Sequence, residues 1–185
     1  MSLHTRIIVG SSVLVAAAAL ASAGCDSKGA SGAEGAQHPL IGNPAPDFTV
    51  DAIPDSKGKL ALSSFQGKVI VVDFWGTFCD PCKQSFPKLQ ELNTKYGAQG
   101  VEIIGVSVDG EEKKGDIPPF LTLTGAKFDI GQDPDGDKVA SQYHPPTMPS
   151  SFVIDKKGVV RFVHSGWHDG EQDELDKEIK QLVAE

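Results

Sequence analysis

The stretch of sequence that decides the fold reads Lys68-Val69-Ile70-Val71-Val72-Asp73-Phe74-Trp75-Gly76-Thr77-Phe78-Cys79-Asp80-Pro81-Cys82. Its first half is rich in β-branched and apolar residues, which predicts a buried central strand. From Cys82 to Tyr96, apolar residues recur at spacings of three and four, which predicts one face of a helix. Pro87 should kink this helix because proline removes an internal hydrogen bond, and Gly97 should end it. Two cysteines therefore lie where a strand gives way to a helix.

Patterns on either side of this stretch predict the rest of the domain. A second buried strand at 101–108 follows the helix, and strand–helix–strand at this length implies a parallel βαβ unit. We also expect a strand at 48–52, a helix at 116–124 capped by Asp116, a strand at 127–130, a helix at 135–143, a hairpin of strands at 152–155 and 159–164, and a last helix with Leu175, Ile179 and Leu182 on one face. The pattern predicts an α/β domain over residues 41–185, with a central mixed β-sheet flanked by helices and a helix inserted after the first βαβ unit.

The composition excludes some classes of protein. The 185 residues carry a formal net charge of −8, so no basic stripe is available to displace counterions from a nucleic acid. Three cysteines cannot build a closed four-cysteine zinc site within one chain. We expect a monomer without a cofactor or a bound metal. The odd number of cysteines means that Cys25 needs its own explanation.

The N-terminal residues predict export and a lipid anchor. Arg6 precedes an apolar run at 7–20, which is shorter than the roughly 20 residues of a membrane span and typical of a secretory signal. Small residues then lead to Cys25, which resembles the lipidated first residue of a bacterial lipoprotein. We therefore expect residues 1–24 to be a signal peptide and Cys25 to be lipidated. The alternative is ordinary cleavage after Ala23, which would leave a stray thiol in an oxidising compartment.

Residues 25–40 are mostly small and polar, and they lack the side chains to build a core. We expect them to form a flexible linker, in which the thirteen residues 26–38 have a reach of about 20 Å. A lipid anchor at one end of this linker would hold the folded domain close to a membrane in the periplasm or another extracytoplasmic compartment.

Cys79 and Cys82 carry the strongest chemical signal. One helical turn separates them, which brings their sulfur atoms close enough for a disulfide. Cys79 lies just before the helix, where unpaired amides and the positive end of the helix dipole lower the thiol pKa and favour the nucleophilic thiolate. Cys82 lies one turn further and can resolve a mixed disulfide. The pattern predicts a redox-active pair, with a metal site or a structural disulfide as the alternatives.

The segment from Trp75 to Cys82, with Pro87 five residues further on, resembles the active-site segment of the thioredoxin superfamily. The inserted helix before Phe128 and the segment Pro149-Ser150-Ser151-Phe152-Val153-Ile154-Asp155 resemble the TlpA/ResA-like branch. The likeness covers about residues 41–185 and implies a thioredoxin-like fold. It also implies an exported, membrane-anchored reductase of the kind that often serves cytochrome c or oxidase maturation. The sequence departs from the pattern with Phe78 in place of a Trp and Gly76 in place of an Ala.

Asp73 interrupts the apolar strand two residues before Trp75. Burial would raise the pKa of its carboxyl toward neutrality, so it could accept the proton of Cys82 when that thiol attacks a mixed disulfide. The matching position in thioredoxin is also a buried Asp, for which this role has been proposed. The alternative is a carboxyl satisfied by backbone hydrogen bonds.

Pro149 resembles the cis-proline that lies beside the active site in the thioredoxin family, although Pro145 and Pro146 are competing candidates. With a cis bond there, the Met148 backbone would lie exposed next to Cys79. It could then pair with a substrate peptide as an added strand. We assign Trp75 and Pro81 to the same substrate-docking surface.

The residues between the cysteines indicate a reductase. Asp80 places a negative charge beside Cys79 and opposes thiolate formation, and Pro81 is the residue that thioredoxin has there. Both favour a reduction potential nearer about −270 mV than about −120 mV. A reductase of protein disulfides in an oxidising compartment needs a membrane thiol electron donor.

Other interpretations stay open or are set aside. A copper metallochaperone could use Cys79, Cys82 and a histidine, and peroxidase chemistry is weaker because peroxiredoxins carry Thr or Ser where Gly76 stands. His164 and His168 flank a glycine after a strand, so we interpret them as a surface loop and not as a metal site. The acidic run 133–137 is interpreted as a turn.

Overall fold

The computed structural model describes residues 37–185. The predicted signal peptide, the predicted lipidation of Cys25 and most of the predicted linker lie outside the described residues. Within 37–185, the structure contains no helix with the length and apolar character to cross a membrane.

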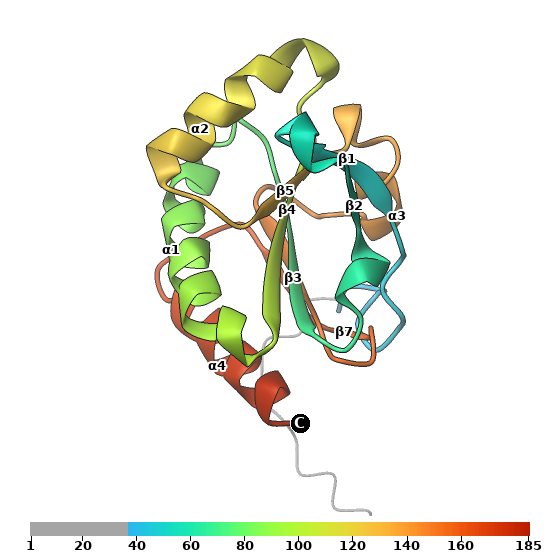
Figure 1. The fold of residues 1–185 in the computed structure, drawn as a ribbon. Helices are drawn as coiled ribbons and strands as arrows, with labels where there is room; N and C mark the ends of the chain where they lie inside the picture. Colours follow the sequence, from blue (N-terminus) through green and yellow to red (C-terminus); the bar gives the residue numbers. More distant parts are fainter. Residues whose placement is uncertain (1–36) are drawn as a thin grey trace, which may run out of the picture. The chain divides into compact units, whose positions relative to one another are not determined.

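One mixed sheet forms the centre of the domain (Figure 1). Its strands are β1 (Thr49–Ile53), β2 (Lys59–Ala61), β3 (Val69–Trp75), β4 (Val101–Ser107), β5 (Asp129–Gln132), β6 (Ser150–Ile154) and β7 (Val160–Ser165), in the order β2-β1-β5-β4-β3-β6-β7. Strands β3, β4 and β5 run parallel, whereas β1, β2, β6 and β7 pair antiparallel with their neighbours. Every residue of β3 is buried between β4 and β6, as the apolar run predicts.

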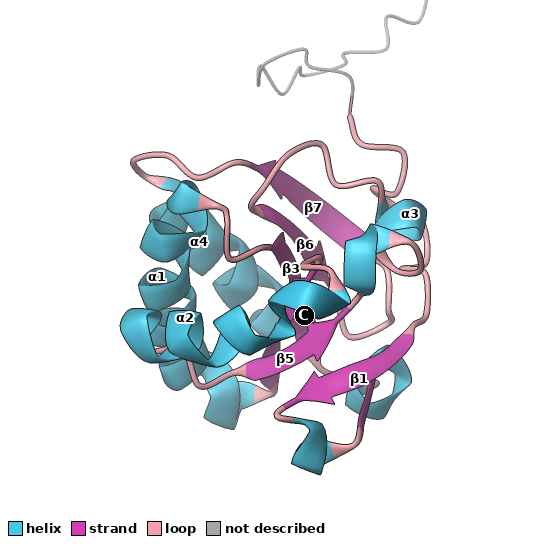
Figure 2. Cartoon of the chain, turned by 90° about the horizontal axis from the view of Figure 1, so that it is seen from above, coloured by secondary structure: helices cyan, strands magenta, loops and turns pink. Residues whose placement is uncertain are grey.

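Helices cover both faces of this sheet. Three of them, α1 (Asp80–Tyr96), α2 (Ile117–Thr124) and α4 (Glu171–Ala184), lie on one side, and the short α3 (Ala140–Tyr143) lies on the other (Figure 2). Helix α2 follows the β3-α1-β4 unit and is the predicted inserted helix. Short 3-10 helices connect these elements at Asp55–Lys57, Leu62–Phe65, Gly97–Gln99, Glu111–Asp116 and Pro134–Gly136. The predicted fold class is confirmed.

Strand β3 divides the core into two halves because successive side chains of a strand point to opposite faces. Val69, Val71 and Trp75 pack with the buried face of α1, whereas the intervening Ile70, Val72 and Phe74 pack on the opposite side with Tyr143 of α3. The face of α1 that is buried is the one that the spacing of its apolar residues predicts, and it includes Cys82.

Several local predictions differ from the structure in detail. Gly97 is the C-cap of α1, as predicted, but it has right-handed helical angles and a 3-10 turn continues to Gln99. Gly100, with a φ of 83°, ends that turn in a conformation that favours glycine. Asp116 precedes α2 but its side chain makes no capping hydrogen bond. Strand β2 was not predicted at all. Helix α1 runs through Pro87, and the kink there stays a prediction.

The predicted helix at 135–143 is much shorter in the structure. Its α-helical part is only Ala140–Tyr143, and Asp135 has a left-handed φ of 60° in the preceding turn. The buried Asp133 carboxylate accepts hydrogen bonds from the backbone amides of Lys138, Val139 and Ala140 and so organises this turn. The interpretation of 133–137 as a turn is therefore correct.

Candidate redox site

The structure joins Cys79 and Cys82 in a disulfide, with 5.3 Å between their Cα atoms. Cys79 is the N-cap of α1, and its Sγ accepts a hydrogen bond of 3.2 Å from the backbone amide of Cys82. Cys79 keeps 6% of its surface exposed, whereas Cys82 is fully buried. The sulfur that an incoming partner can reach first is therefore that of Cys79.

A buried carboxylate fixes the loop that carries Cys79. Asp109, two residues beyond the end of β4, is 1% exposed. It accepts hydrogen bonds from the Thr77 amide at 2.9 Å, the Thr77 hydroxyl at 2.7 Å and the Ser107 hydroxyl at 2.8 Å. Gln132 of β5 donates to the Asp109 carbonyl at 3.2 Å. Sequence reasoning missed Asp109, although an acidic residue just after a buried strand was a usable signal.

Phe78 lies directly before Cys79 and is 61% exposed. Its ring packs over Gly76, where an added Cβ would lie 2.4 Å from Phe78 Cε1. The Lys113 ammonium group lies 5.7 Å from the centre of the same ring. Gly76 and Phe78 are thus matched to each other, which explains why the sequence departs from the thioredoxin pattern at both positions. Phe78 is also an apolar surface beside the reactive sulfur that sequence reasoning did not assign to the site.

Asp73 is fully buried in β3, between Gly105 of β4 and Ser151 of β6. The Ser151 hydroxyl donates a hydrogen bond of 2.6 Å to Asp73 Oδ1, and Oδ2 has no hydrogen-bond partner within the described chain. Loss of solvation raises the pKa of the Asp73 carboxyl to about 7, against the smaller opposing effect of the Ser151 hydrogen bond. The alternative interpretation, a carboxyl satisfied by backbone donors, does not match these contacts.

The structure places Asp73 on the same side of the sheet as the cysteine pair. In β3 its side chain shares a face with Val71 and Trp75, which pack in one cluster with Cys79 and Cys82. A buried acid with a pKa near neutrality therefore lies beneath the helix that carries the second cysteine.

The assignment of Trp75 to the docking surface needs correction. Trp75 is fully buried, with ring centroids 4.6 Å from Phe86 and 4.7 Å from Phe120. Gly105 leaves room for the indole, because a Cβ there would lie 3.1 Å from Trp75 Nε1. Trp75 supports the site from below and offers no surface to a partner.

The other predicted docking residues differ in burial: Pro81 is exposed, Met148 is half-buried and Pro149 is buried. The Met148–Pro149 peptide bond is cis. Met148 is half-buried against the cluster that contains both cysteines, and Pro149 is buried with its carbonyl accepting from the Gly166 amide at 2.8 Å. Among residues 37–185, no other residue forms a backbone hydrogen bond with Met148. Pro81 is exposed in the first turn of α1.

Asp80 is less isolated than the sequence suggests. Its carboxylate lies 2.7 Å from the Lys83 ammonium group, and the hydrogen bond from Lys83 lowers the pKa of Asp80. The positive charge one turn away offsets part of the effect that we assigned to Asp80 on the Cys79 thiol. The charge of Asp80 is therefore weaker support for a low reduction potential of the Cys79–Cys82 pair than the sequence alone indicates.

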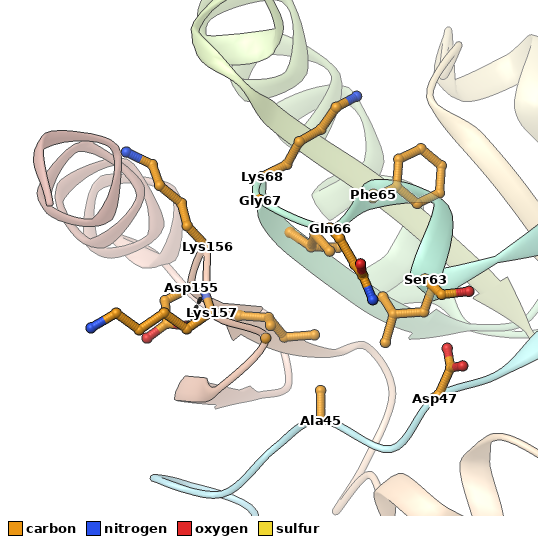
Figure 3. A pocket seen from close by; sticks show the side chains of 14 residues that line it. Ala45, Asp47, Ser63, Phe65, Gln66, Gly67, Lys68, Asp155, Lys156 and Lys157 are labelled. Carbon is orange, nitrogen blue, oxygen red and sulfur yellow. Dashed lines mark hydrogen bonds between the residues drawn. The ribbon is translucent and has the colours of Figure 1, made fainter.

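A cavity of about 400 Å³ lies elsewhere in the domain (Figure 3). Its lining includes Gly67, Lys68 and Ile70 at the start of β3 and the turn at 155–158. The cysteines follow the other end of β3, roughly 20 Å away for a seven-residue strand. The cavity is therefore not part of the cysteine site.

A disulfide across Cys-x-x-Cys at the start of a helix, on a mixed sheet flanked by helices, defines a thiol–disulfide oxidoreductase of thioredoxin-like fold. The chain belongs to the AhpC/TSA family, whose model matches residues 41–163. It is 38% identical to the thiol-disulfide oxidoreductase ResA of Geobacillus kaustophilus over 127 residues, which are 68% of this chain and 70% of that protein. The ResA protein of Bacillus anthracis is 38% identical over 120 residues, covering 65% of this chain and 66% of the relative. The chain thus spans about two thirds of the length of these curated relatives.

The fold is also similar to that of solved structures. The crystal structure of a Chlorobium tepidum protein assigned as the thiol:disulfide interchange protein DsbE has a TM-score of 0.71 and 32% identity to this chain. That match covers 77% of this chain and 97% of the other.

Proposed function

We propose that this chain is an exported reductase of disulfides in proteins, with Cys79 as the nucleophile and Cys82 as the resolving thiol. The observation that carries the proposal is the Cys79–Cys82 disulfide, which exposes only Cys79 and lies above a buried Asp73. The names of the relatives support the same reaction class.

The reaction starts from the reduced pair. The Cys79 thiolate attacks one sulfur of a substrate disulfide, forms a mixed disulfide and releases the first substrate thiolate. Cys82 loses its proton and attacks Cys79 Sγ, which releases the second substrate thiolate and leaves the Cys79–Cys82 disulfide. Two electrons pass to the substrate, and a thiol donor must then reduce the pair again.

Asp73 serves as the proton acceptor for Cys82. A carboxyl with a pKa of about 7 is partly ionised at neutral pH, so it can both take up a proton and release it again. Asp73 Oδ2 has no hydrogen-bond partner among the described residues, so this oxygen is free to accept a proton. The Asp73 side chain lies on the same face of β3 as Val71 and Trp75, which pack with the two cysteines.

Substrate docking involves Met148, Pro149, Pro81 and Phe78. The free backbone of Met148 suits an extended peptide that adds to the end of β6. Phe78 supplies the exposed apolar contact that we had assigned to Trp75.

The sequence supports the cellular part of the proposal. A signal peptide at 1–24, a lipid anchor on Cys25 and a linker at 25–40 would hold a monomeric domain close to a membrane in the periplasm or another extracytoplasmic compartment. In this proposal a membrane thiol donor reduces the Cys79–Cys82 pair again after each turnover. The substrates are disulfides of proteins in cytochrome c or oxidase maturation. Copper binding gains no support, because among residues 37–185 no histidine or carboxylate forms a set of three ligand atoms with the two sulfurs.

The first test is the reduction potential of the Cys79–Cys82 pair, measured by alkylation and mass after equilibration in redox buffers. We expect a value near about −270 mV, which suits a reductase fed by a donor of lower potential. A value near about −120 mV would make the protein an oxidant and overturn the proposed direction.

A second test assigns the order of attack. Cys82→Ser should trap clients in mixed disulfides on Cys79, because the resolving thiol is missing. The matched Cys79→Ser variant keeps the buried thiol and should trap none. Trapping by Cys79→Ser and not by Cys82→Ser would reverse the two roles.

A further inference from the structure

The Ser151 side chain lies against the buried carboxyl of Asp73. Ser151 belongs to β6, faces Asp73 of β3 in the register of these two strands and is 4% exposed. Its hydroxyl donates the hydrogen bond of 2.6 Å to Asp73 Oδ1, and the Asp73 side chain accepts no other hydrogen bond within residues 37–185. Sequence reasoning assigned Ser151 no role in the reaction. In the structure it is the single group that holds this carboxyl by a hydrogen bond.

The geometry of this hydrogen bond favours the ionised form of Asp73. A hydroxyl approaches a charged carboxylate to about 2.5–2.7 Å, which is closer than it approaches a neutral acceptor. A donor to the charged form of an acid stabilises that form against the neutral one. Because the Ser151 hydroxyl occupies Oδ1 alone, it also fixes Oδ2 as the oxygen that is left to accept a proton.

The charged groups on the other side of Ser151 are already paired with one another. His164 of β7 faces Ser151 in the register of the sheet and is 9% exposed, so the interpretation of His164 as part of a surface loop is wrong. Its Nε2 lies 2.6 Å from Glu178 Oε2, and its Nδ1 lies 2.5 Å from Glu171 Oε1. Both glutamates belong to α4. The imidazole is therefore held by two carboxylates, and the Ser151 hydroxyl remains directed to Asp73.

The remaining neighbours of Asp73 do not take the place of Ser151. Gly105 of β4 faces Asp73 from the other neighbouring strand and has no side chain. Helix α1 brings Cys82 to this face of the sheet, where its sulfur is bonded to Cys79 in this structure. Two effects thus set the pKa of the Asp73 carboxyl: burial raises it to about 7, and the hydrogen bond from Ser151 opposes that rise. Loss of the hydroxyl should raise the pKa further.

We propose that Ser151 is a positioning residue for the proton transfer from Cys82, because its hydroxyl stabilises the ionised form of Asp73 and keeps Oδ2 free to accept the proton. This inference rests on the proposed function, in which Asp73 is the proton acceptor. The proton moves from Cys82 Sγ to Asp73 Oδ2, and the Ser151 hydroxyl keeps its own proton. Without that hydroxyl, a smaller fraction of Asp73 is ionised at neutral pH and Cys82 loses its proton more slowly.

The test separates the two steps of the reaction by stopped flow. Cys25 of the full, tag-free chain is alkylated while the pair is oxidised, and the pair is then reduced and mixed with an aromatic disulfide whose thiolate product is coloured. The first phase of colour reports the attack by Cys79, and the second reports the release of the mixed disulfide by Cys82. Because a hydrogen bond to a charged group changes a pKa by about one unit, Ser151→Ala should move the pH midpoint of the second phase up by about that amount. The second phase should then be about fivefold slower at pH 7 and almost unchanged at pH 9, whereas the midpoint of the first phase should not move.

Ser107→Ala is the matched control. Ser107 is also a buried serine of a central strand whose hydroxyl donates to a buried carboxylate, but its partner is Asp109. This variant should keep the wild-type midpoint of the second phase, and so should Ser151→Thr, which retains a hydroxyl; circular dichroism verifies the fold of each variant.

An unchanged midpoint in Ser151→Ala, or an equal shift in Ser107→Ala, would overturn the inference about Ser151. Asp73→Asn, measured in the same way, distinguishes this failure from a failure of the proposed function. If Asp73→Asn slows the second phase and Ser151→Ala leaves its midpoint unchanged, Asp73 remains the proton acceptor and only the role of Ser151 is wrong. If Asp73→Asn leaves the second phase unchanged, Asp73 is not the acceptor and both proposals fail.

Discussion

Two buried carboxylates on neighbouring strands, Asp73 in β3 and Asp109 just after β4, have opposite surroundings. Both are almost completely removed from water. Asp73 accepts one hydrogen bond from Ser151, whereas Asp109 accepts three from Thr77 and Ser107. Asp73 keeps one oxygen without a donor and its pKa is raised to about 7, whereas the three hydrogen bonds to Asp109 hold the loop of Thr77 in place. Burial alone does not define the role of an acidic side chain.

The largest effect should appear in the pH dependence of stability. Burial raises the Asp73 pKa from 3.8 to about 7, so between those values the folded state keeps a proton that the unfolded state has lost. The contribution of Asp73 to stability therefore falls as the pH rises from about 4 to about 7, by up to roughly 1.4 kcal/mol per unit, or about 4 kcal/mol in all. Asp73→Asn removes this contribution.

The measurement is urea unfolding of the oxidised wild-type protein and of Asp73→Asn at several pH values from 4 to 8. The difference in unfolding free energy between them should grow in favour of Asp73→Asn as the pH rises. If the unfolding free energies of the wild-type protein and of Asp73→Asn changed in parallel with pH, the Asp73 carboxyl would not have the raised pKa that distinguishes its surroundings from those of Asp109.

The next effect concerns Asp109. Asp109→Ala leaves one buried and two half-buried donors without their acceptor, which should lower the free energy of unfolding by about 3 kcal/mol. Asp116→Ala is a suitable control, since Asp116 is exposed and its side chain makes no capping bond, and it should change stability by less than about 0.5 kcal/mol. Urea unfolding at one pH compares the two. Equal effects would mean that the Asp109 network contributes nothing specific.

Turnover should depend far more on Asp73 than on Asp109. Asp73→Asn should slow disulfide reduction about a hundredfold near neutral pH, because the proton acceptor for Cys82 is lost. Asp109→Asn keeps an acceptor oxygen for Thr77 and should slow it only about threefold. Single-turnover kinetics across pH 5–9 should also show that an apparent pKa near 7 disappears in Asp73→Asn alone. If Asp109→Asn were the slower enzyme, the two roles would be exchanged.

The smallest effect lies on the exposed side of the loop that Asp109 anchors. Gly76→Ala should cost about 1 kcal/mol of stability because the new Cβ meets the Phe78 ring, which can move only by leaving its place over Gly76. In a Phe78→Ala background the same substitution should cost almost nothing, and a double-mutant cycle would measure this coupling. Additive effects in the cycle would show that the ring and Gly76 are independent.

The sequence predicted the elements whose signal is local. The apolar run of β3, the helical spacing in α1 and the Cys-x-x-Cys at their junction are each contained within a few residues, and all three are found in the structure. Asp73 was also recognisable, because a single charge in an apolar strand is visible in the sequence. Trp75 was misplaced because its neighbours in the sequence do not reveal that Phe86 and Phe120 cover it.

The sequence by itself therefore determined the class of fold, the redox pair and one buried acid beside it. Only the tertiary structure decided which carboxylate lacks donors, which aromatic is exposed and which histidine joins a cluster of glutamates. The physical reason is distance along the chain. Helical and strand periodicity act between near neighbours, whereas Thr77 reaches Asp109 across 32 residues and Ser151 reaches Asp73 across 78. The packing of the sheet brings such groups together, and no local pattern records which pairs will meet.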